Sequence, residues 1–165
     1  MENADGGKAD GECEEKQVKN RMEKIILDTD IGDDIDDALA LQLALNSPEL
    51  ELIGVTTVCK RSDLRARIAR SLLAANGKDG IPVVCGACEP LSGSWDGLSD
   101  PNQYDPATMG SADVDRETGA VRFLCEQAAR RPGEVTVVAI GMLTNVARAI
   151  QDDPNFVRNV KRIVL

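Results

Sequence analysis

Short β-rich segments alternate with helix-like segments from residue 24 to the end of the chain. The strand-like segments are apolar and rich in Val and Ile, and the segments between them have helical periodicity. Strands are predicted at 24–27, 51–58, 81–84, 134–140 and 160–165, and helices at 36–46, 63–75, 115–130 and 143–152. This alternation predicts an α/β fold, an open and mostly parallel sheet with flanking helices. Such sheets bind ligands at the carboxyl ends of their strands.

A dense group of aspartates follows the first predicted strand. Six lie within ten residues: Asp28, Asp30, Asp33, Asp34, Asp36 and Asp37. Like charges this close repel one another, which raises their pKa values and costs stability. A hard cation such as Ca²⁺ or Mg²⁺ would relieve that repulsion. We interpret the group as a metal site, with a solvated acidic loop at a helix start as the alternative.

Polar residues also follow two other predicted strands. Thr56 and Thr57 lie near the end of the second strand, and 141–145 (GMLTN) follows the fourth. The parallel topology predicts that these residues meet the aspartates in one crevice. Thr144 and Asn145 also fit simple N-capping of the helix that begins there.

Composition excludes several classes of site. The chain contains no histidine, which removes Ser-His-Asp and Cys-His catalysis and the usual imidazole zinc sites. Its net charge of −9 disfavours nucleic acid and anionic membranes as partners. Aromatic residues make up only 2%, so the core must be aliphatic.

The five cysteines indicate a reducing compartment. Their number is odd and no segment resembles a signal peptide, so we expect free thiols and a cytoplasmic location. Cys85 and Cys88 have the two-residue spacing of redox pairs, which is a weak signal by itself. No apolar run reaches the length of a membrane span.

The remaining segments give four further expectations. Residues 1–22 form a polar acidic tail that we expect to be disordered, and 23–165 form the α/β domain. The loop 89–110 is long and irregular, and its Trp95 fits a substrate-covering segment or a turn anchored by one aromatic.

The last strand has no helix after it, so we expect the domain to be incomplete at its C-terminus, with a short closing edge strand as the alternative. Arginines of the second helix are expected on its solvated face: Arg65, Arg67 and Arg70.

Several blocks resemble one known family, the inosine-uridine preferring nucleoside hydrolases. The similar blocks occur in the family's order and are 26–32 (ILDTDIG), 36–40 (DDALA), 54–58 (GVTTV), 81–87 (IPVVCGA), 143–147 (LTNVA) and 160–165. The resemblance implies a Rossmann-like nucleoside hydrolase fold of which this chain is the amino-terminal portion. It also implies hydrolysis of the N-glycosidic bond of ribonucleosides to free base and ribose, in purine or pyrimidine salvage, and a homo-oligomer at full length.

The resemblance further implies a Ca²⁺ cofactor and roles for particular residues. Asp30, Asp37 and the Thr144 carbonyl would bind the ion, and Asp30 would also act as the base toward the calcium-bound water. Asp36 would face the ribose hydroxyls. Asp28 and Asn145 would support their neighbours. Carboxylates beside a metal suit this reaction, because it passes through an oxocarbenium-like state and needs an activated water.

The chain departs from the family in two respects. Cys59, Lys60 and Arg61 replace a Gly-Asn or Gly-Asp pair whose polar residue reaches the substrate, and the family's later ligands and ribose-binding residues are missing from this sequence. A catalytically inactive, truncated member that binds metal or a partner is therefore the alternative function. A third interpretation, a phosphatase with Asp28 and Asp30 as its nucleophile motif, lacks the expected hydroxyl at Gly32.

Overall fold

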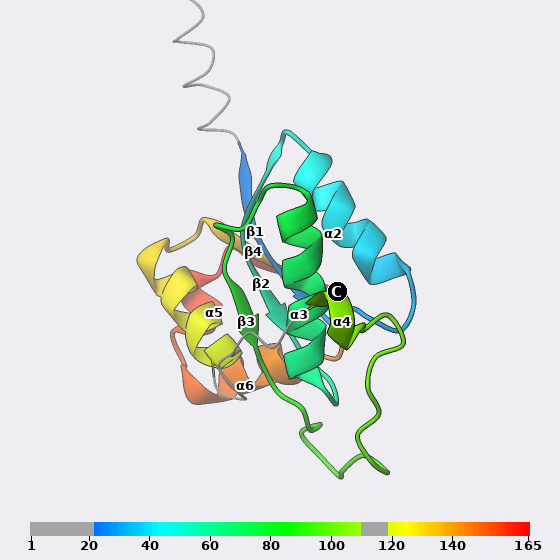
Figure 1. Cartoon of the computed structure of the whole chain (residues 1–165). Helices are drawn as coiled ribbons and strands as arrows, with labels where there is room; N and C mark the ends of the chain where they lie inside the picture. The colour runs from blue at the N-terminus through cyan, green and yellow to red at the C-terminus, as the bar shows by residue number, and fades with distance from the viewer. Residues whose placement is uncertain (1–21, 110–118) are drawn as a thin grey trace, which may run out of the picture.

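The computed structural model describes residues 22–109 and 119–165, and these form one five-stranded parallel sheet. The strand order is β3-β2-β1-β4-β5, with β1 in the centre (Figure 1). The strands are β1 (Glu23–Thr29), β2 (Leu50–Thr57), β3 (Val83–Cys85), β4 (Val135–Ala139) and β5 (Arg162–Val164). The predicted α/β fold with a parallel sheet is thus confirmed. The predicted acidic tail lies almost entirely outside the described residues.

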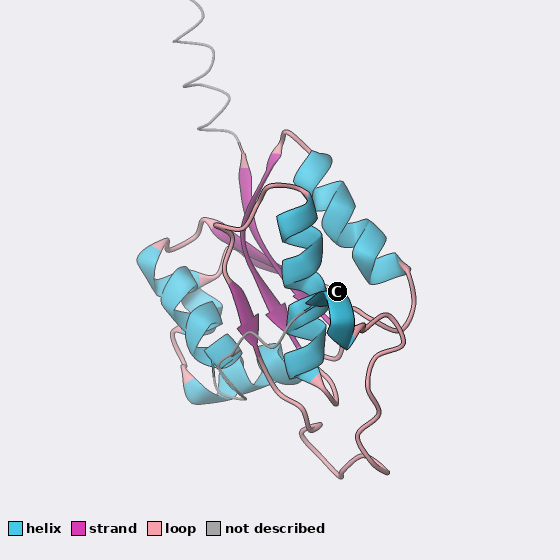
Figure 2. Ribbon diagram, in the orientation of Figure 1, coloured by secondary structure: helices cyan, strands magenta, loops and turns pink. Residues whose placement is uncertain are grey.

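Helices cover both faces of the sheet (Figure 2). Helices α2 (Asp36–Asn46) and α3 (Ser62–Ala75) lie on one face, and α5 (Gly119–Arg130) and α6 (Thr144–Asp152) lie on the other. The chain builds β1, β2 and β3 in one direction and then crosses back to place β4 on the other side of β1. The strand order therefore reverses at β1, and the crevice at such a reversal is where doubly wound sheets bind ligands.

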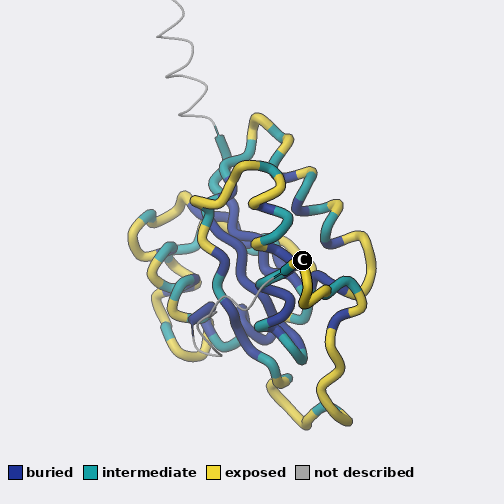
Figure 3. Tube along the Cα trace, in the orientation of Figure 1, coloured by how far each residue is buried: buried dark blue, intermediate teal, exposed yellow. Residues whose placement is uncertain are grey.

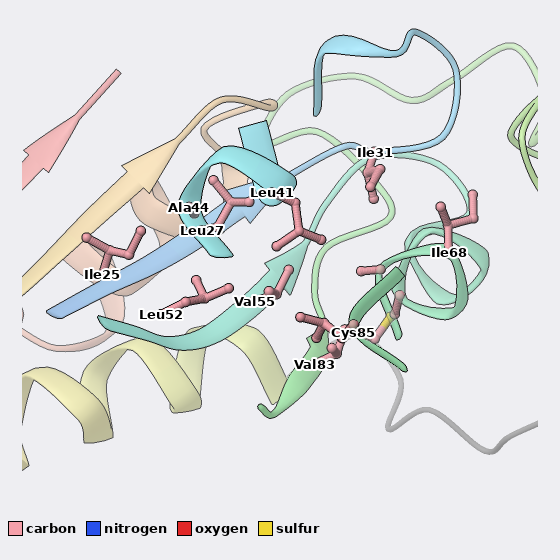
Figure 4. Close-up of a cluster of buried hydrophobic side chains, with 13 residues drawn as sticks. Ile25, Leu27, Ile31, Leu41, Ala44, Leu52, Val55, Ile68, Val83 and Cys85 are labelled. Carbon is pink, nitrogen blue, oxygen red and sulfur yellow. The ribbon is translucent and has the colours of Figure 1, made fainter. Parts of the chain in front are cut away.

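Two aliphatic clusters hold the layers together. The first joins α2 and α3 to β1, β2 and β3 and includes Ile25, Leu27, Leu41 and Val55 (Figure 4). The second joins α5 and α6 to the opposite sheet face. Figure 3 shows that the buried residues concentrate in the strands, whereas most of loop 89–105 is exposed. Burial of aliphatic side chains on both faces accounts for a core with few aromatics.

Two short helices and one helix cap differ from the prediction. Helix α4 (Pro106–Met109) lies in the segment predicted to be irregular, and α7 (Phe156–Asn159) was not predicted. Helix α3 begins after Arg61 without a side-chain cap, and the hydroxyl of Ser62 bonds to the β3 end instead. Helix α6 likewise has no side-chain cap, so the expected capping by Thr144 or Asn145 is wrong. In both cases tertiary partners compete successfully for the polar side chain.

One part of the sheet is not covered by any helix of residues 22–109 and 119–165. An open groove of about 420 Å³ lies between α2 and the β4–β5 edge, with Leu27, Leu43, Val138 and Val164 in its lining. Strand β5 forms one edge of the sheet in the described residues. No helix in the described ranges is long and apolar enough to cross a membrane.

Candidate functional site

The carboxylate of Asp28 lies at the centre of a buried polar group at the carboxyl ends of β1, β2 and β4. Asp28 Oδ1 accepts hydrogen bonds from Thr56 Oγ1 at 2.5 Å and Asn145 Nδ2 at 2.8 Å. All three residues are fully buried. They come from three different segments, which confirms that residues after these strands meet in one place.

The second oxygen of this carboxylate has no partner. Asp28 Oδ2 is buried and forms no hydrogen bond to the described residues. Burial penalises the charged form and raises the pKa of Asp28 from 3.8 to about 6, although Thr56 and Asn145 act in the opposite direction. A buried and unsatisfied carboxylate oxygen is costly, and functional sites are common places to find one.

Asn145 is held from three sides. Its Nδ2 also donates to the Thr57 carbonyl at 2.9 Å, and its Oδ1 accepts from the Ala87 N–H at 2.9 Å. Gly86 lets the β3 end approach this amide, because a Cβ at that position would lie 2.4 Å from Asn145 Oδ1. Asn145 therefore connects the ends of β2 and β3 to Asp28. The sequence predicted Asn145 as a supporting residue, and the structure gives the contacts through which it could act.

Asp30 and Asp37 form the second part of the site. Thr29 Oγ1 donates to Asp37 Oδ1 at 2.5 Å and accepts from the Ile31 N–H at 3.0 Å. Burial raises the pKa values of both Asp30 and Asp37, and for Asp37 the negative charge of Asp30 raises the pKa further. These two carboxylates therefore interact electrostatically in a partly buried position.

The other predicted site residues, the substrate-binding Asp36 and the metal ligand Thr144, form fewer contacts. Asp36 is exposed, and its Oδ1 caps the backbone N–H of Asp37 at 3.1 Å. Thr144 is buried beside Asn145 in the first turn of α6. Gly141 packs closely on Asp30, since a Cβ there would lie 2.7 Å from the Asp30 backbone nitrogen. The turn that carries Thr144 is thus adjacent to the aspartate loop.

Arg65 is the main residue that the sequence interpretation missed. It was expected on a solvated helix face, but its side chain is only 2% exposed. Its guanidinium donates to the carbonyls of Cys59, Ile31 and Asp30 and forms an ion pair with Asp33 at 2.7 Å. The guanidinium of Arg65 therefore holds the backbone of the aspartate loop in place. Its positive charge also opposes the rise that burial causes in the pKa values of Asp30 and Asp37. The only signal for this contact in the sequence was an acidic loop that needs a positive partner, and its Asp33 lies 32 residues before Arg65.

Lys60 and Arg61 contact the long loop. Arg61 forms ion pairs with Asp63 at 3.0 Å and Asp100 at 2.8 Å. The Lys60 ammonium lies 5.6 Å from the centroid of the Trp95 ring. Lys60 and Arg61, at the position where a polar pair was expected from the resemblance, therefore both have neighbouring partners.

The long loop is tied to the site at both ends. Trp95 Nε1 donates to the Cys88 carbonyl at 2.8 Å, which fits the turn anchored by an aromatic better than a free cover. Gln103 donates from its backbone to the Gly32 carbonyl and from its side chain to the Asp34 carbonyl. Asp34 therefore lies at the outer side of the loop and does not join Asp28, Asp30 and Asp37.

The arrangement offers only part of a metal site. Among residues 22–109 and 119–165, no group of three or more Asp, Glu, His or Cys side chains is arranged to hold a metal ion. The donor chemistry still suits a hard cation, because Asp28 has an unsatisfied oxygen and Asp30 and Asp37 repel each other. The six aspartates do not all converge, since Asp33 pairs with Arg65.

The chain matches a family and a set of enzymes with related names. Residues 25–165 match the family model for inosine-uridine preferring nucleoside hydrolases. The chain is 37% identical to uridine nucleosidase 1 of Arabidopsis thaliana, a match over 100% of this chain and 49% of that protein. It is 35% identical to the inosine-uridine preferring nucleoside hydrolase of Leishmania major over 86% of this chain and 47% of that protein.

A solved structure agrees with these matches. The plant nucleoside hydrolase PpNRh1 superposes with a TM-score of 0.75 at 36% identity, covering 86% of this chain and 46% of that one. This chain thus spans about half the length of the relatives it matches. From the sequence blocks, the parallel sheet and these matches, the chain belongs to the inosine-uridine preferring nucleoside hydrolase family.

Proposed function

We propose that this chain provides the metal-binding and water-activating part of a ribonucleoside hydrolase site. The observation that carries the proposal is the buried group of Asp28, Thr56 and Asn145 next to Asp30 and Asp37 at the strand-order reversal. The names of the relatives support uridine and inosine as substrates to test first. The cofactor proposed is Ca²⁺, because the available donors are hard oxygens.

The roles proposed follow from where each side chain lies. Asp30 and Asp37, with the Thr144 carbonyl, would hold the ion. A bound divalent cation would lower the pKa of water and orient it for attack. Asp30 would accept the proton of the attacking water, and the exposed Asp36 would bind the ribose hydroxyls. Asp28 and Asn145 would keep these groups in position.

The negative charge of the site suits the reaction. Cleavage of an N-glycosidic bond builds positive charge on the ribose ring in the transition state. Carboxylates held close to that ring stabilise this charge, whereas a free cation there would oppose it. The contacts of Lys60 with Trp95 and of Arg61 with Asp63 and Asp100 engage these two cations with neighbouring groups. This pairing reduces the repulsion that the charges of Lys60 and Arg61 would exert on the positively charged transition state.

A second candidate is an inactive member of the family that binds metal or a partner. It is favoured by the incomplete ligand group of the described residues. The two candidates differ in catalysis, and the second could bind either the metal or a partner. A cytoplasmic location and a homo-oligomeric state at full length stay predictions.

Calcium titration calorimetry and a nucleosidase assay on this chain test the proposal together. We expect calcium binding that Asp30→Asn and Asp37→Asn weaken by at least about tenfold each. Asp34→Asn is the matched control, because Asp34 is exposed and removed from the buried carboxylates. Absence of calcium binding would refute the metal site.

Product analysis then separates the two candidates. Release of free uracil or hypoxanthine by the 165-residue chain supports the hydrolase. Calcium binding with no base released from any common ribonucleoside supports the inactive member. The hydrolase proposal also predicts that a form of the chain extended to the relatives' length releases base.

A further inference from the structure

Cys85 and Cys88 lie at the end of β3 and are not used by the proposed hydrolase site. Both sulfur atoms contact one hydroxyl group, with Ser62 Oγ 2.9 Å from Cys85 Sγ and 3.3 Å from Cys88 Sγ. The two sulfur atoms are therefore no more than about 6 Å apart, a separation that a small movement of the turn closes to a disulfide bond. The sequence spacing alone did not establish this proximity.

In the reduced protein the Ser62 hydroxyl contacts both thiols and one backbone carbonyl. The Ser62 hydroxyl donates its proton to the Gly86 carbonyl at 2.7 Å, so it can act only as an acceptor toward the thiols. The same oxygen thus accepts hydrogen bonds from both thiols. Formation of a disulfide would remove these two contacts and move the residues between the cysteines.

The two cysteines differ in their access to solvent. Cys85 is only 1% exposed, whereas Cys88 is half-buried. A groove of about 340 Å³ reaches both thiols, and its wall carries two cations, Lys60 and Arg61, and two carboxylates, Asp63 and Glu89. Oxidised glutathione is a small disulfide that carries both carboxylates and amino groups, so it can pair with both kinds of charge in this wall as it approaches Cys88.

We propose that Cys85 and Cys88 form a reversible dithiol–disulfide pair that exchanges with glutathione. The Cys88 thiolate attacks oxidised glutathione, which forms a mixed disulfide and releases one reduced glutathione. The Cys85 thiolate then attacks the Cys88 sulfur, which closes the Cys85–Cys88 bond and releases the second reduced glutathione. The two thiol protons pass to the two glutathione thiolates, so one glutathione disulfide is reduced for each protein disulfide formed.

This pair is connected to the candidate site through the residues between the cysteines. The Ala87 N–H donates to Asn145 Oδ1, and Gly86 packs against the same amide. Asn145 in turn donates to Asp28. Closing the disulfide shifts Gly86 and Ala87 and therefore loosens the support of Asp28.

Peptide mapping of the folded 165-residue chain tests the proposal. The chain is equilibrated in glutathione buffers of increasing oxidation, blocked with N-ethylmaleimide and digested with trypsin. Residues 79–115 contain no Lys or Arg, so both cysteines stay on one tryptic peptide. We expect alkylation of Cys85 and Cys88 to fall together by at least about tenfold, with a peptide lighter by two hydrogen atoms.

Two variants test the order of the steps. In Cys85→Ser, Cys88 should accumulate as the glutathione adduct, whereas in Cys88→Ser the buried Cys85 should remain reduced. Cys125→Ser is the matched control, because this half-buried cysteine belongs to α5 and should not affect the pair. Circular dichroism of the oxidised wild type confirms that the fold is kept.

The outcomes separate clearly. A Cys85–Cys88 peptide in the folded protein that reduced glutathione reverses supports the proposal. Continued alkylation of both thiols in the most oxidising buffer, or a glutathione adduct on Cys88 with no internal disulfide, overturns it. Calcium titration of the oxidised protein adds a second readout, with affinity expected to fall about tenfold. Only this second readout depends on the proposed metal site, so its failure leaves the redox pair standing.

Discussion

Replacing Asp28 with asparagine should remove part of the pH dependence of stability of the metal-free protein. The pKa of Asp28 is raised from 3.8 to about 6 in the fold by burial. A carboxyl group with a higher pKa in the folded state binds its proton more tightly there than in the unfolded chain. Stability therefore rises as the pH falls from 7 through 6 and reaches its full gain below 4.

The size of the effect follows from the two pKa values. The whole shift corresponds to about 3 kcal/mol, and the part gained between pH 7 and pH 5 is about 1 kcal/mol. Asp30 and Asp37 also have raised pKa values and add to the same trend. We expect urea unfolding in EDTA to give the wild type at least about 1 kcal/mol more stability at pH 5 than at pH 7.

The variants make the measurement specific to one carboxyl group. Asp28→Asn should reduce the difference between pH 5 and pH 7 by about 1 kcal/mol, whatever its effect on absolute stability. Asp33→Asn is the control, because the pKa of Asp33 is lowered by Arg65 and the group stays ionised in both states over this range. An unchanged pH dependence in Asp28→Asn would refute the assigned burial of this charge.

Three further substitutions test the packing of the site by urea unfolding. Gly86→Ala should destabilise the fold by about 2 kcal/mol because its Cβ collides with Asn145, whereas Gly80→Ala, which meets nothing within 4 Å, should be nearly neutral. Asn145→Ala should cost about 2 kcal/mol or more, because it leaves the Ala87 N–H and the Thr57 carbonyl without this partner. Arg65→Met should cost about 3 kcal/mol or more, since it strips three carbonyls and Asp33 of a buried donor. Equal stability of Gly86→Ala and Gly80→Ala, or of either other variant and wild type, would contradict the contacts described.

The regular elements were predictable because local patterns determine them. The helix 36–46 agrees with α2 at both ends, since Asp36 and Asp37 open it and Ser47-Pro48 ends it. Strands were located to within about two residues because each is a short aliphatic run between polar segments. The short helices α4 and α7 were missed, because a single turn carries too little periodicity to be read from sequence.

The site was predictable in its location but not in its bonding. The sequence placed Asp28, Thr56 and Asn145 at neighbouring strand ends, which parallel topology requires to be close. It could not show that Asn145 would bond to Asp28 and not to its own helix, because that choice depends on partners distant in the chain. Arg65 was misplaced for the same reason, since most of its partners, the carbonyls of Asp30 and Ile31 and the Asp33 carboxylate, come from a loop more than thirty residues away.

The central position of β1 sets the order in which the sheet can assemble. Its pairing with β2 joins residues such as Glu23 and Leu50, whereas its pairing with β4 joins Lys24 and Val135. Contacts between residues close in sequence form sooner, because less chain entropy is lost in closing the loop. The unit of β1, α2 and β2 should therefore fold early, both in refolding and on the ribosome. Until β4 arrives, one side of β1 remains an unpaired edge, and this is the stage at which the nascent chain is most exposed to aggregation.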